Sequence, residues 1–382
     1  MKRFAPRATY VLVVLLLHAC AGKPPVLPPP APPASAAETD LTLFLIGDAG
    51  KPKAGGDPVL LALSERIQGT PGEAFVVFLG DNIYDYGLPA EDAEDRKEME
   101  RRLLDQIQAV GGTKARAIFV PGNHDWSNSG EGGLEAIRRQ GEFIRQHGYD
   151  GRVIMLPEKG CPGPSVFDVG ERLRLIALDT EWWLHTRTKP GPDECAPGTE
   201  EAVVDALREN LARTGDRYAV VVAHHPLLSS ASHGGYFNWQ DHLFPLTREW
   251  GALWIPLPGI GSLYPLIRKL GATPQDLSSE RNRQMRSALE DAFRDHPPLV
   301  FAGGHEHTLE VLNGDVVPNL LVSGTGYYGH TSPTKWRPET RYQEAASGFL
   351  RLDFLRNGEV RLGVLTVEES GAVEEPFAIQ LR

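Results

Sequence analysis

The chain has few cysteines, a deficit of basic residues and no apolar run long enough to cross a bilayer as a helix. Its 39 basic and 50 acidic side chains give a formal net charge of −11, which argues against a general binder of nucleic acids or anionic membranes. The three cysteines show no metal-ligand spacing, and no internal repeat is apparent. The hydrophobic content of 41% is that of a soluble globular protein, and 382 residues allow one large or two modest domains.

The N-terminus has the pattern of an export signal, with three basic residues in the first seven before the apolar run 10–17. This run ends in Leu17-His18-Ala19-Cys20, which resembles the lipobox of bacterial lipoproteins, although His18 is unusual in that pattern. We predict a signal peptide over residues 1–19 and a lipid anchor on Cys20. The protein would then be an exported cell-envelope lipoprotein, periplasmic or anchored to the outer membrane. An ordinary cleaved signal and secretion is the alternative.

Residues 20–38 are rich in proline and alanine and offer nothing from which to build a core. We predict a tether that holds the folded domain, residues 39–382, away from the membrane. In an exported protein, Cys161 and Cys195 predict one disulfide that closes a loop around Asp179, with two unpaired buried thiols as the alternative.

Short apolar runs alternate with helical patterns from Leu41 onward. The predicted strands are 41–46, 74–79, 116–120, 173–178, 218–223, 298–302, 319–323, 348–353 and 360–366. The predicted helices are 57–68, 91–109, 132–147, 199–213 and 281–294. This order predicts an α/β fold of two packed mixed β-sheets flanked by helices.

Residues 234–275 interrupt the alternation with tryptophans, prolines and the apolar run 253–260. We interpret them as an insertion packed on the domain. A lid over a site, or a surface that contacts lipid or a partner, is the alternative.

Five short motifs follow predicted strands in a fixed order. They are Gly47-Asp48-Ala49-Gly50, Gly80-Asp81-Asn82-Ile83-Tyr84, Gly122-Asn123-His124-Asp125, Val221-Val222-Ala223-His224 and Gly304-His305-Glu306-His307. In α/β sheets, side chains that follow strands gather at the carboxyl ends of those strands. Each motif adds one or two oxygen or nitrogen ligands, enough together for two metal ions that share one carboxylate. Asp81 is the natural bridge, because it follows a strongly apolar strand and is central in the series.

These motifs resemble those of the calcineurin-like metallophosphoesterases, and within them the purple acid phosphatases, over about residues 41–366. Most of that superfamily has a histidine ligand at the place of Gly50, whereas the purple group has a tyrosine that matches Tyr84. The resemblance implies that Asp48, Tyr84 and His307 bind the first ion, that Asn123, His224 and His305 bind the second, and that Asp81 bridges them. A tyrosinate favours Fe³⁺ at the first position. Fe²⁺, Zn²⁺ or Mn²⁺ could fill the second.

The resemblance also implies outer-shell acids, His124 and His233, with Asp125 orienting the ring of His124. Asp179 is interpreted as structural and His225 as packed or outer-shell, while His185, His242 and His330 carry no motif. The implied reaction is hydrolysis of small phosphate monoesters by in-line attack of a metal-bound hydroxide. Its rivals are a phosphodiesterase acting on nucleotides or phospholipid head groups and a non-catalytic phosphate-binding lipoprotein. The sequence indicates no nucleic-acid partner and identifies no protein partner, and a membrane enters only through the lipid anchor.

Overall fold

A computed structural model describes residues 30–33, 38–248 and 253–382. The predicted signal peptide, Cys20 and most of the predicted tether lie outside these ranges. Within them, no helix is both long enough and apolar enough to cross a membrane.

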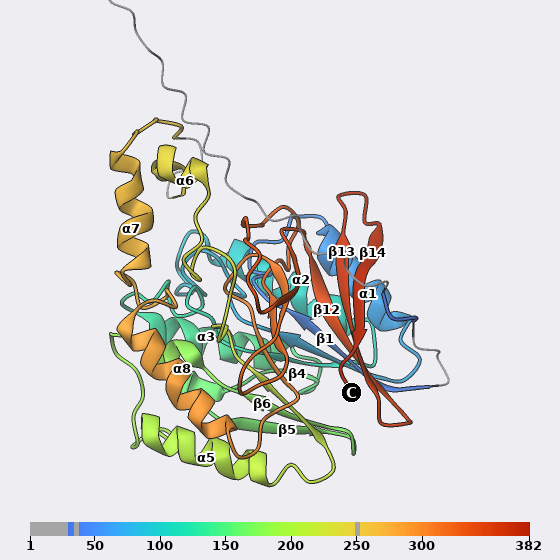
Figure 1. The fold of residues 1–382 in the computed structure, drawn as a ribbon. Coiled ribbons are helices and arrows are strands. Elements are labelled where there is room, and N and C mark those ends of the chain that lie inside the picture. Colours follow the sequence, from blue (N-terminus) through green and yellow to red (C-terminus); the bar gives the residue numbers. More distant parts are fainter. Residues whose placement is uncertain (1–29, 34–37, 249–252) are drawn as a thin grey trace, which may run out of the picture.

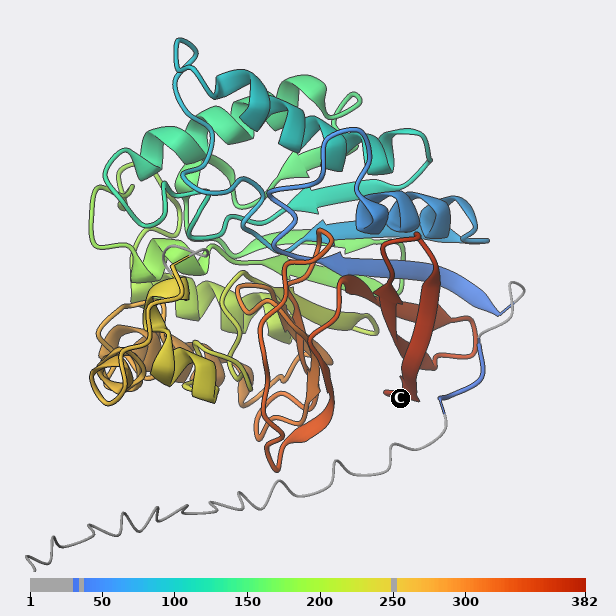
Figure 2. The same ribbon diagram turned by 90° about the horizontal axis from the view of Figure 1, so that it is seen from above.

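The described residues form two seven-stranded sheets packed face to face between helices (Figures 1 and 2). The first has the order β14-β13-β12-β1-β2-β3-β4 and the second β11-β9-β10-β8-β7-β6-β5. The strands of the first sheet are β1 (Thr39–Ile46), β2 (Glu73–Phe78), β3 (Arg116–Phe119), β4 (Val153–Met155), β12 (Gly348–Leu355), β13 (Val360–Val367) and β14 (Val373–Gln380). Those of the second are β5 (Ser165–Val169), β6 (Leu173–Ala177), β7 (Tyr218–Val222), β8 (Val300–Gly303), β9 (Leu309–Leu312), β10 (Leu320–Ser323) and β11 (Thr340–Glu344).

Both sheets are mixed, which confirms the predicted fold class. Strands β1 to β4 run parallel in the first sheet, as do β6, β7, β8 and β10 in the second, and the outer pairs are antiparallel. Parallel strands need crossover connections, and the long helices supply most of them. The carboxyl ends of β1, β2, β3, β7 and β8 are therefore free to carry loops on one side of the molecule.

The helices connect the strands, and the longer ones lie on the outer faces of the sheets. They are α1 (Pro58–Gln68), α2 (Arg96–Gly111), α3 (Gly133–His147), α4 (Thr180–Leu184), α5 (Glu200–Ala212), α6 (Trp239–Leu243), α7 (Leu263–Lys269) and α8 (Glu280–Phe293), with 3-10 turns at Glu158–Gly160, Pro245–Arg248 and Ile260–Ser262. Helices α1, α2 and α3 cover the first sheet, and α5 and α8 lie together against the second (Figures 1 and 2).

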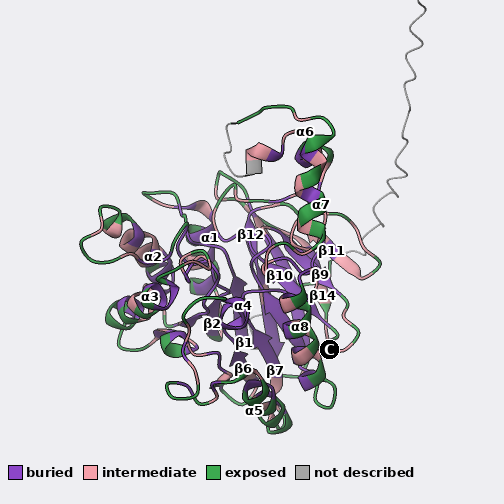
Figure 3. Ribbon diagram, turned by 90° about the vertical axis from the view of Figure 1, so that its left-hand side faces the viewer, coloured by how far each residue is buried: buried purple, intermediate pink, exposed green. Residues whose placement is uncertain are grey.

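Strand β1 shows why its sequence is apolar at successive positions. Leu43 and Leu45 enter the cluster between the two sheets, whereas Phe44 and Ile46 enter the cluster under the helices, and all four are fully buried. A parallel strand covered on both faces needs this continuous apolar run rather than strict alternation. The centre of the first sheet is thus fixed by burial on both sides (Figure 3).

The nine predicted strands and five predicted helices are all present. The prediction over 91–109 was wrong at its start, because α2 begins at Arg96. The buried face of α2 runs from Met99 through Leu103 to Ile107, and residues 91–95 have no large apolar side chain to add to it. The elements missed were the short helices α4, α6 and α7 and the strands β4, β5, β9, β11 and β14, most of them short or near sheet edges.

The predicted disulfide between Cys161 and Cys195 is present and spans 34 residues. The predicted tether is held in part: Arg361 of β13 donates to the carbonyl oxygens of Ala31 (3.0 Å) and Pro32 (2.9 Å), and the Ala31 amide donates to Ala378. Residues 30–33 therefore contact the folded body through β13 and β14.

Candidate metal centre and its pocket

The first feature of the site is unusual backbone geometry directly after the strands. Asp48, Asp81 and His305 have φ angles of 57°, 53° and 68°, in the left-handed region that side chains other than Gly, Asn and Asp rarely adopt. Such conformations persist where the surrounding structure imposes them, and they gather at functional sites. Here they turn the three side chains toward one another across the ends of the sheets.

Two glycines of the motifs allow this close approach. A Cβ on Gly80 would lie 2.5 Å from His224 Nδ1, and the φ of Gly80 is +92°. A Cβ on Gly50 would lie 2.5 Å from the backbone oxygen of Asp81. Gly50 is therefore required for packing of the two loops, besides leaving the place of a histidine ligand empty.

One group of polar atoms converges on the phenol of Tyr84. Tyr84 Oη lies 2.8 Å from Asp48 Oδ1, 3.3 Å from Asp81 Oδ2 and 3.3 Å from His307 Nε2. Metal–ligand bonds of about 2.0–2.2 Å place neighbouring ligand atoms roughly 3 Å apart. These four side chains thus have the spacing of a single coordination shell.

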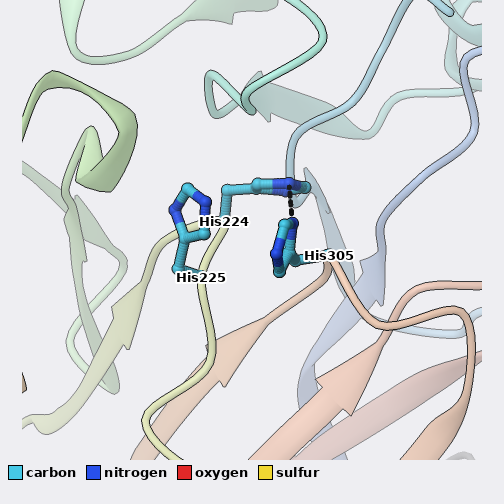
Figure 4. Close-up of side chains that lie close together, drawn as sticks. All are labelled: His224, His225 and His305. Carbon is cyan, nitrogen blue, oxygen red and sulfur yellow. Dashed lines mark hydrogen bonds between the residues drawn. The ribbon is translucent and has the colours of Figure 1, made fainter. Parts of the chain in front are cut away.

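A second group converges on Asn123. Asn123 Oδ1 lies 3.1 Å from His224 Nε2 and 3.0 Å from His305 Nδ1, and the two histidine nitrogens are 3.2 Å apart (Figure 4). Asp81 Oδ1 lies 3.4 Å from His224 Nε2. The two oxygens of Asp81 therefore face different groups, as a bridging carboxylate requires.

The protons in the second group show that it suits a cation. His224 Nδ1 donates to the Leu79 carbonyl at 2.8 Å, and His305 Nε2 donates to the Gln275 carbonyl at 3.3 Å. Because a carbonyl only accepts, these contacts leave the other nitrogen of each ring facing Asn123 Oδ1. Burial lowers the pKa of His224, but the carboxylates of Asp81 and Asp48 raise it to about 10, so this group of atoms favours a positive charge. A metal ion can supply that charge in place of the extra proton, so the donor set fits a metal.

The burial of Asp48 and Asp81 is a further reason to expect positive charge in the site. It raises the pKa of Asp48 to about 7, and it would raise that of Asp81 too, but His224 and His124 hold the pKa of Asp81 below its usual range. Two carboxylates in one buried site are costly without compensating positive charge. This is a second reason why these residues fit metal ions.

His225 also lies beside His224 and His305 (Figure 4). Both of its ring nitrogens are engaged elsewhere, Nδ1 with Thr180 Oγ1 at 2.9 Å and Nε2 with Gln275 Oε1 at 2.5 Å. We therefore assign His225 to the packing around the site, in line with the sequence interpretation.

The interpretation that Asp125 orients His124 was wrong. The Asp125 carboxylate is buried and accepts from the backbone amides of Asn82, Ile83 and Gly122 at 2.8–3.1 Å, and also from Gln140 at 3.0 Å. It ties the second and third motif loops together, since their amides need a buried acceptor. His124 Nδ1 donates instead to the Asp85 carbonyl at 2.7 Å.

The groups open into a pocket of about 360 Å³ to which both predicted acids contribute. His124 Nε2 lies 3.9 Å from Asp81 Oδ2. His233 lies against His305, with ring centroids 4.1 Å apart and ring planes tilted by 43°, and its Nδ1 lies 3.1 Å from Asp276 Oδ1. Asp276 in turn pairs with Arg268 at 2.5 Å.

The sequence interpretation of 234–275 was an insertion packed on the domain, with a lid over the site as an alternative, and the structure places part of this insertion in the pocket wall. Tyr264, Arg268, Thr273 and Gln275 all line the pocket, so one wall of the site comes from residues interpreted as packing. His330, which carries no motif, lies against His307 with ring centroids 3.6 Å apart and ring planes tilted by 38°. No recognised motif marks these residues in the sequence.

Two buried glutamates position the loop that carries His233. Glu306 accepts from the Gly234 amide at 2.8 Å, and Glu310 accepts from Ser230 N at 2.9 Å and Thr308 Oγ1 at 2.8 Å. Burial raises the pKa of both, that of Glu310 to about 7. Glu306, which lies between the proposed ligands His305 and His307 in the fifth motif, thus positions the loop that carries His233.

Two mixed sheets with these side chains at their strand ends form the sandwich of a metallophosphoesterase. The calcineurin-like phosphoesterase family model matches residues 41–309, and the chain belongs to that family. Purple acid phosphatase 17 of Arabidopsis thaliana is 24% identical over 219 residues, 55% of this chain and 59% of that protein. The chain thus spans less than two thirds of that relative, and the resemblance to purple acid phosphatases is confirmed.

Solved structures agree on the fold. GAP50, described as the anchor in the inner membrane complex of Plasmodium, has a TM-score of 0.53 at 16% identity, with 89% of each chain covered. The purple acid phosphatase PPD1 from yellow lupin (Lupinus luteus) seeds has a TM-score of 0.51 at 15% identity, covering 91% of this chain and 55% of that one. At these identities the likeness concerns the fold alone.

Proposed function

We propose that this protein hydrolyses phosphate monoesters at a two-metal centre. The observation that carries the proposal is Asp81, whose two oxygens face separate groups of ligand atoms. The proposed ligands of the first ion are Asp48, Tyr84 and His307, and those of the second are Asn123, His224 and His305. When bound, the ions would supply positive charge for the phosphate and lower the pKa of a bound water.

The two outer histidines are proposed as the groups that handle protons and phosphate oxygens. His124 keeps Nδ1 on the Asp85 carbonyl, so its Nε2 is available on the pocket side to hold a proton for the leaving oxygen. His233 is oriented by the Arg268–Asp276 pair, since its Nδ1 lies 3.1 Å from Asp276 Oδ1 and 3.0 Å from Arg268 Nη2. Asp276 is a positioning residue in this scheme, because it acts through the imidazole.

We further propose Fe³⁺ at the Tyr84 position, since a hard anionic phenolate favours that ion. The second ion is Fe²⁺, Zn²⁺ or Mn²⁺. The purified protein should then show a visible absorption band that disappears in Tyr84→Phe. Metal analysis that finds no iron in fully active protein would overturn this assignment.

The reaction is tested with an aryl phosphate monoester and the matching diester, with Asp81→Asn as the control. Monoester turnover that vanishes in Asp81→Asn supports the proposal. Dominant diester turnover would favour the phosphodiesterase alternative, for which the insertion wall of Tyr264 and Arg268 offers additional contacts. No turnover of either compound by protein that holds two metals would favour the phosphate-binding alternative.

The location of the protein is a separate proposal. We propose that residues 1–19 direct export and that Cys20 carries a lipid anchor in the cell envelope. Mass spectrometry of the mature N-terminus tests this, because an acylated Cys20 and a free N-terminus at another residue differ in mass.

A further inference from the structure

Helix α7 turns its apolar side chains outward. Ile260, Leu263, Leu266, Ile267 and Leu270 are 50–75% exposed, and each lies three or four residues from at least one other of the set. This spacing puts them along one side of the helical segment, the arrangement that normally packs on a core. Here α6 and α7 stand out from the body of the molecule, and the stripe is uncovered among the described residues (Figures 1 and 3).

The other side of the segment fixes this orientation. Pro265 is buried, and Tyr264 and Arg268 line the pocket, where Arg268 pairs with Asp276 and donates to Tyr264 Oη at 2.9 Å. Rotating the helix to bury its apolar stripe would break the ion pair between Arg268 and Asp276 and withdraw both side chains from the pocket. The outward orientation of the apolar side chains therefore follows from the contacts that Tyr264 and Arg268 make in the pocket wall.

The surroundings of the stripe match a lipid surface. Leu253, Trp254 and Ile255 are exposed just before it, and Trp239 of α6 is 68% exposed. Tryptophan is enriched where protein meets the membrane interface. Residues 253–270 contain no acidic side chain, and of their two basic ones Arg268 is paired with Asp276 while Lys269 is exposed, in a chain whose net charge is −11. The overall charge disfavours an anionic bilayer, but this segment does not.

The N-terminal segment limits the distance to the membrane. Residues 30–33 are held against β13 and β14, so only residues 21–29 separate Cys20 from the folded body. That length of chain spans at most about 35 Å when fully extended. A lipid anchor on Cys20 would keep the domain close enough to the bilayer for a projecting segment to touch it.

We propose that residues 253–270 dock on the lipid bilayer as a second membrane contact, which we call the α7 patch. Transfer of the exposed leucine, isoleucine and tryptophan side chains into the interface drives the contact. Because Tyr264 and Arg268 belong to the same segment, docking brings the pocket close to the bilayer surface.

The test uses the predicted mature chain, residues 20–382, with Cys20→Ser in every version, so that neither an acyl chain nor the apolar run 10–17 contributes to partition. Leu266→Ser with Leu270→Ser is compared with Leu61→Ser with Val166→Ser, two residues exposed on other elements. Partition into vesicles of phosphatidylethanolamine and phosphatidylglycerol is measured by flotation. The α7 patch variant should partition roughly tenfold more weakly than its parent, and the control within about twofold of it.

The thermal midpoints of both variants report on folding and should equal that of the parent, since all four side chains are exposed. Equal partition of the two variants would overturn the proposal. A second result would also overturn it: the parent is dimeric without vesicles, the α7 patch variant is monomeric, and the two show no difference in flotation. A second copy of the chain would then cover the stripe. None of these readouts depends on phosphatase activity.

Discussion

At the scale of single residues, backbone carbonyls prepare the histidines of the site. Leu79 fixes the tautomer of His224, Asp85 that of His124, and Gln275 that of His305. Each carbonyl takes one ring proton and leaves the other nitrogen facing the pocket or the ligand groups. Each ring is therefore held in its orientation before any ion or substrate arrives.

His124→Ala should keep both metals and lose activity by about 10²–10⁴-fold, the usual contribution of a general acid. Its Nε2 is 3.9 Å from Asp81 and lies outside the close contacts that define the two ligand groups. Turnover and metal content by mass spectrometry check this, with His296→Ala, an exposed residue, as the control. Loss of a metal would make His124 a ligand instead.

Asp276→Asn should lower kcat by about 10–100-fold, because loss of an outer hydrogen-bond partner typically costs that much. The effect should disappear in a His233→Ala background, since Asp276 acts through that ring. Turnover of the two single variants and the double variant gives the comparison. Additive losses would mean that Asp276 acts mainly by stabilising Arg268 and α7.

At the scale of elements, the helix that follows β6 begins on a buried acid. Asp179 Oδ1 accepts from Trp182 N at 3.0 Å and Oδ2 from Trp126 Nε1 at 2.9 Å, so it caps α4 and holds the loop of the third motif. This is the structural role that the sequence suggested. Burial raises the pKa of Asp179 to about 8.

Because the folded pKa of Asp179 lies above the unfolded value of 3.8, its contribution to stability is complete below about pH 4 and is lost as the pH rises through 8. The free energy of unfolding should therefore fall more steeply between pH 4 and 8 in the parent than in Asp179→Asn. Denaturant titrations at pH 5 and 8 measure the difference. Asp216→Asn, at an exposed site, should follow the parent; parallel curves for Asp179→Asn would contradict the prediction.

At the scale of the whole molecule, one disulfide joins two loops, the loop before β5 and the loop between α4 and α5. The disulfide between Cys161 and Cys195 closes a loop that includes β5, β6 and α4, and so encloses Asp179. Closing such a loop restricts the unfolded chain more than the folded one.

Replacing both cysteines by serine should lower the free energy of unfolding by about 2–4 kcal/mol. Urea titration of the oxidised parent and of the Cys161→Ser, Cys195→Ser variant measures this, and reduction of the parent should reproduce the loss. A variant as stable as the parent would show that the native contacts alone hold this loop.

The strands, the long helices and the positions that converge on the metal centre could be predicted from the sequence. Each predicted ligand lies within a few residues of a strand end. The alternation of apolar strand segments with helical patterns sets where the strands end, so local sequence patterns are enough to predict these positions. The roles of Asp125, Asp276 and Gln275 could not be predicted, because their partners are up to about one hundred residues away. The outward stripe of α7 likewise depends on Arg268 meeting Asp276 and Tyr264 at the pocket. The sequence by itself determined which side chains the site contains, because short-range patterns place them after strands. Only tertiary packing decided which groups orient those side chains and which apolar side chains of α7 face outward.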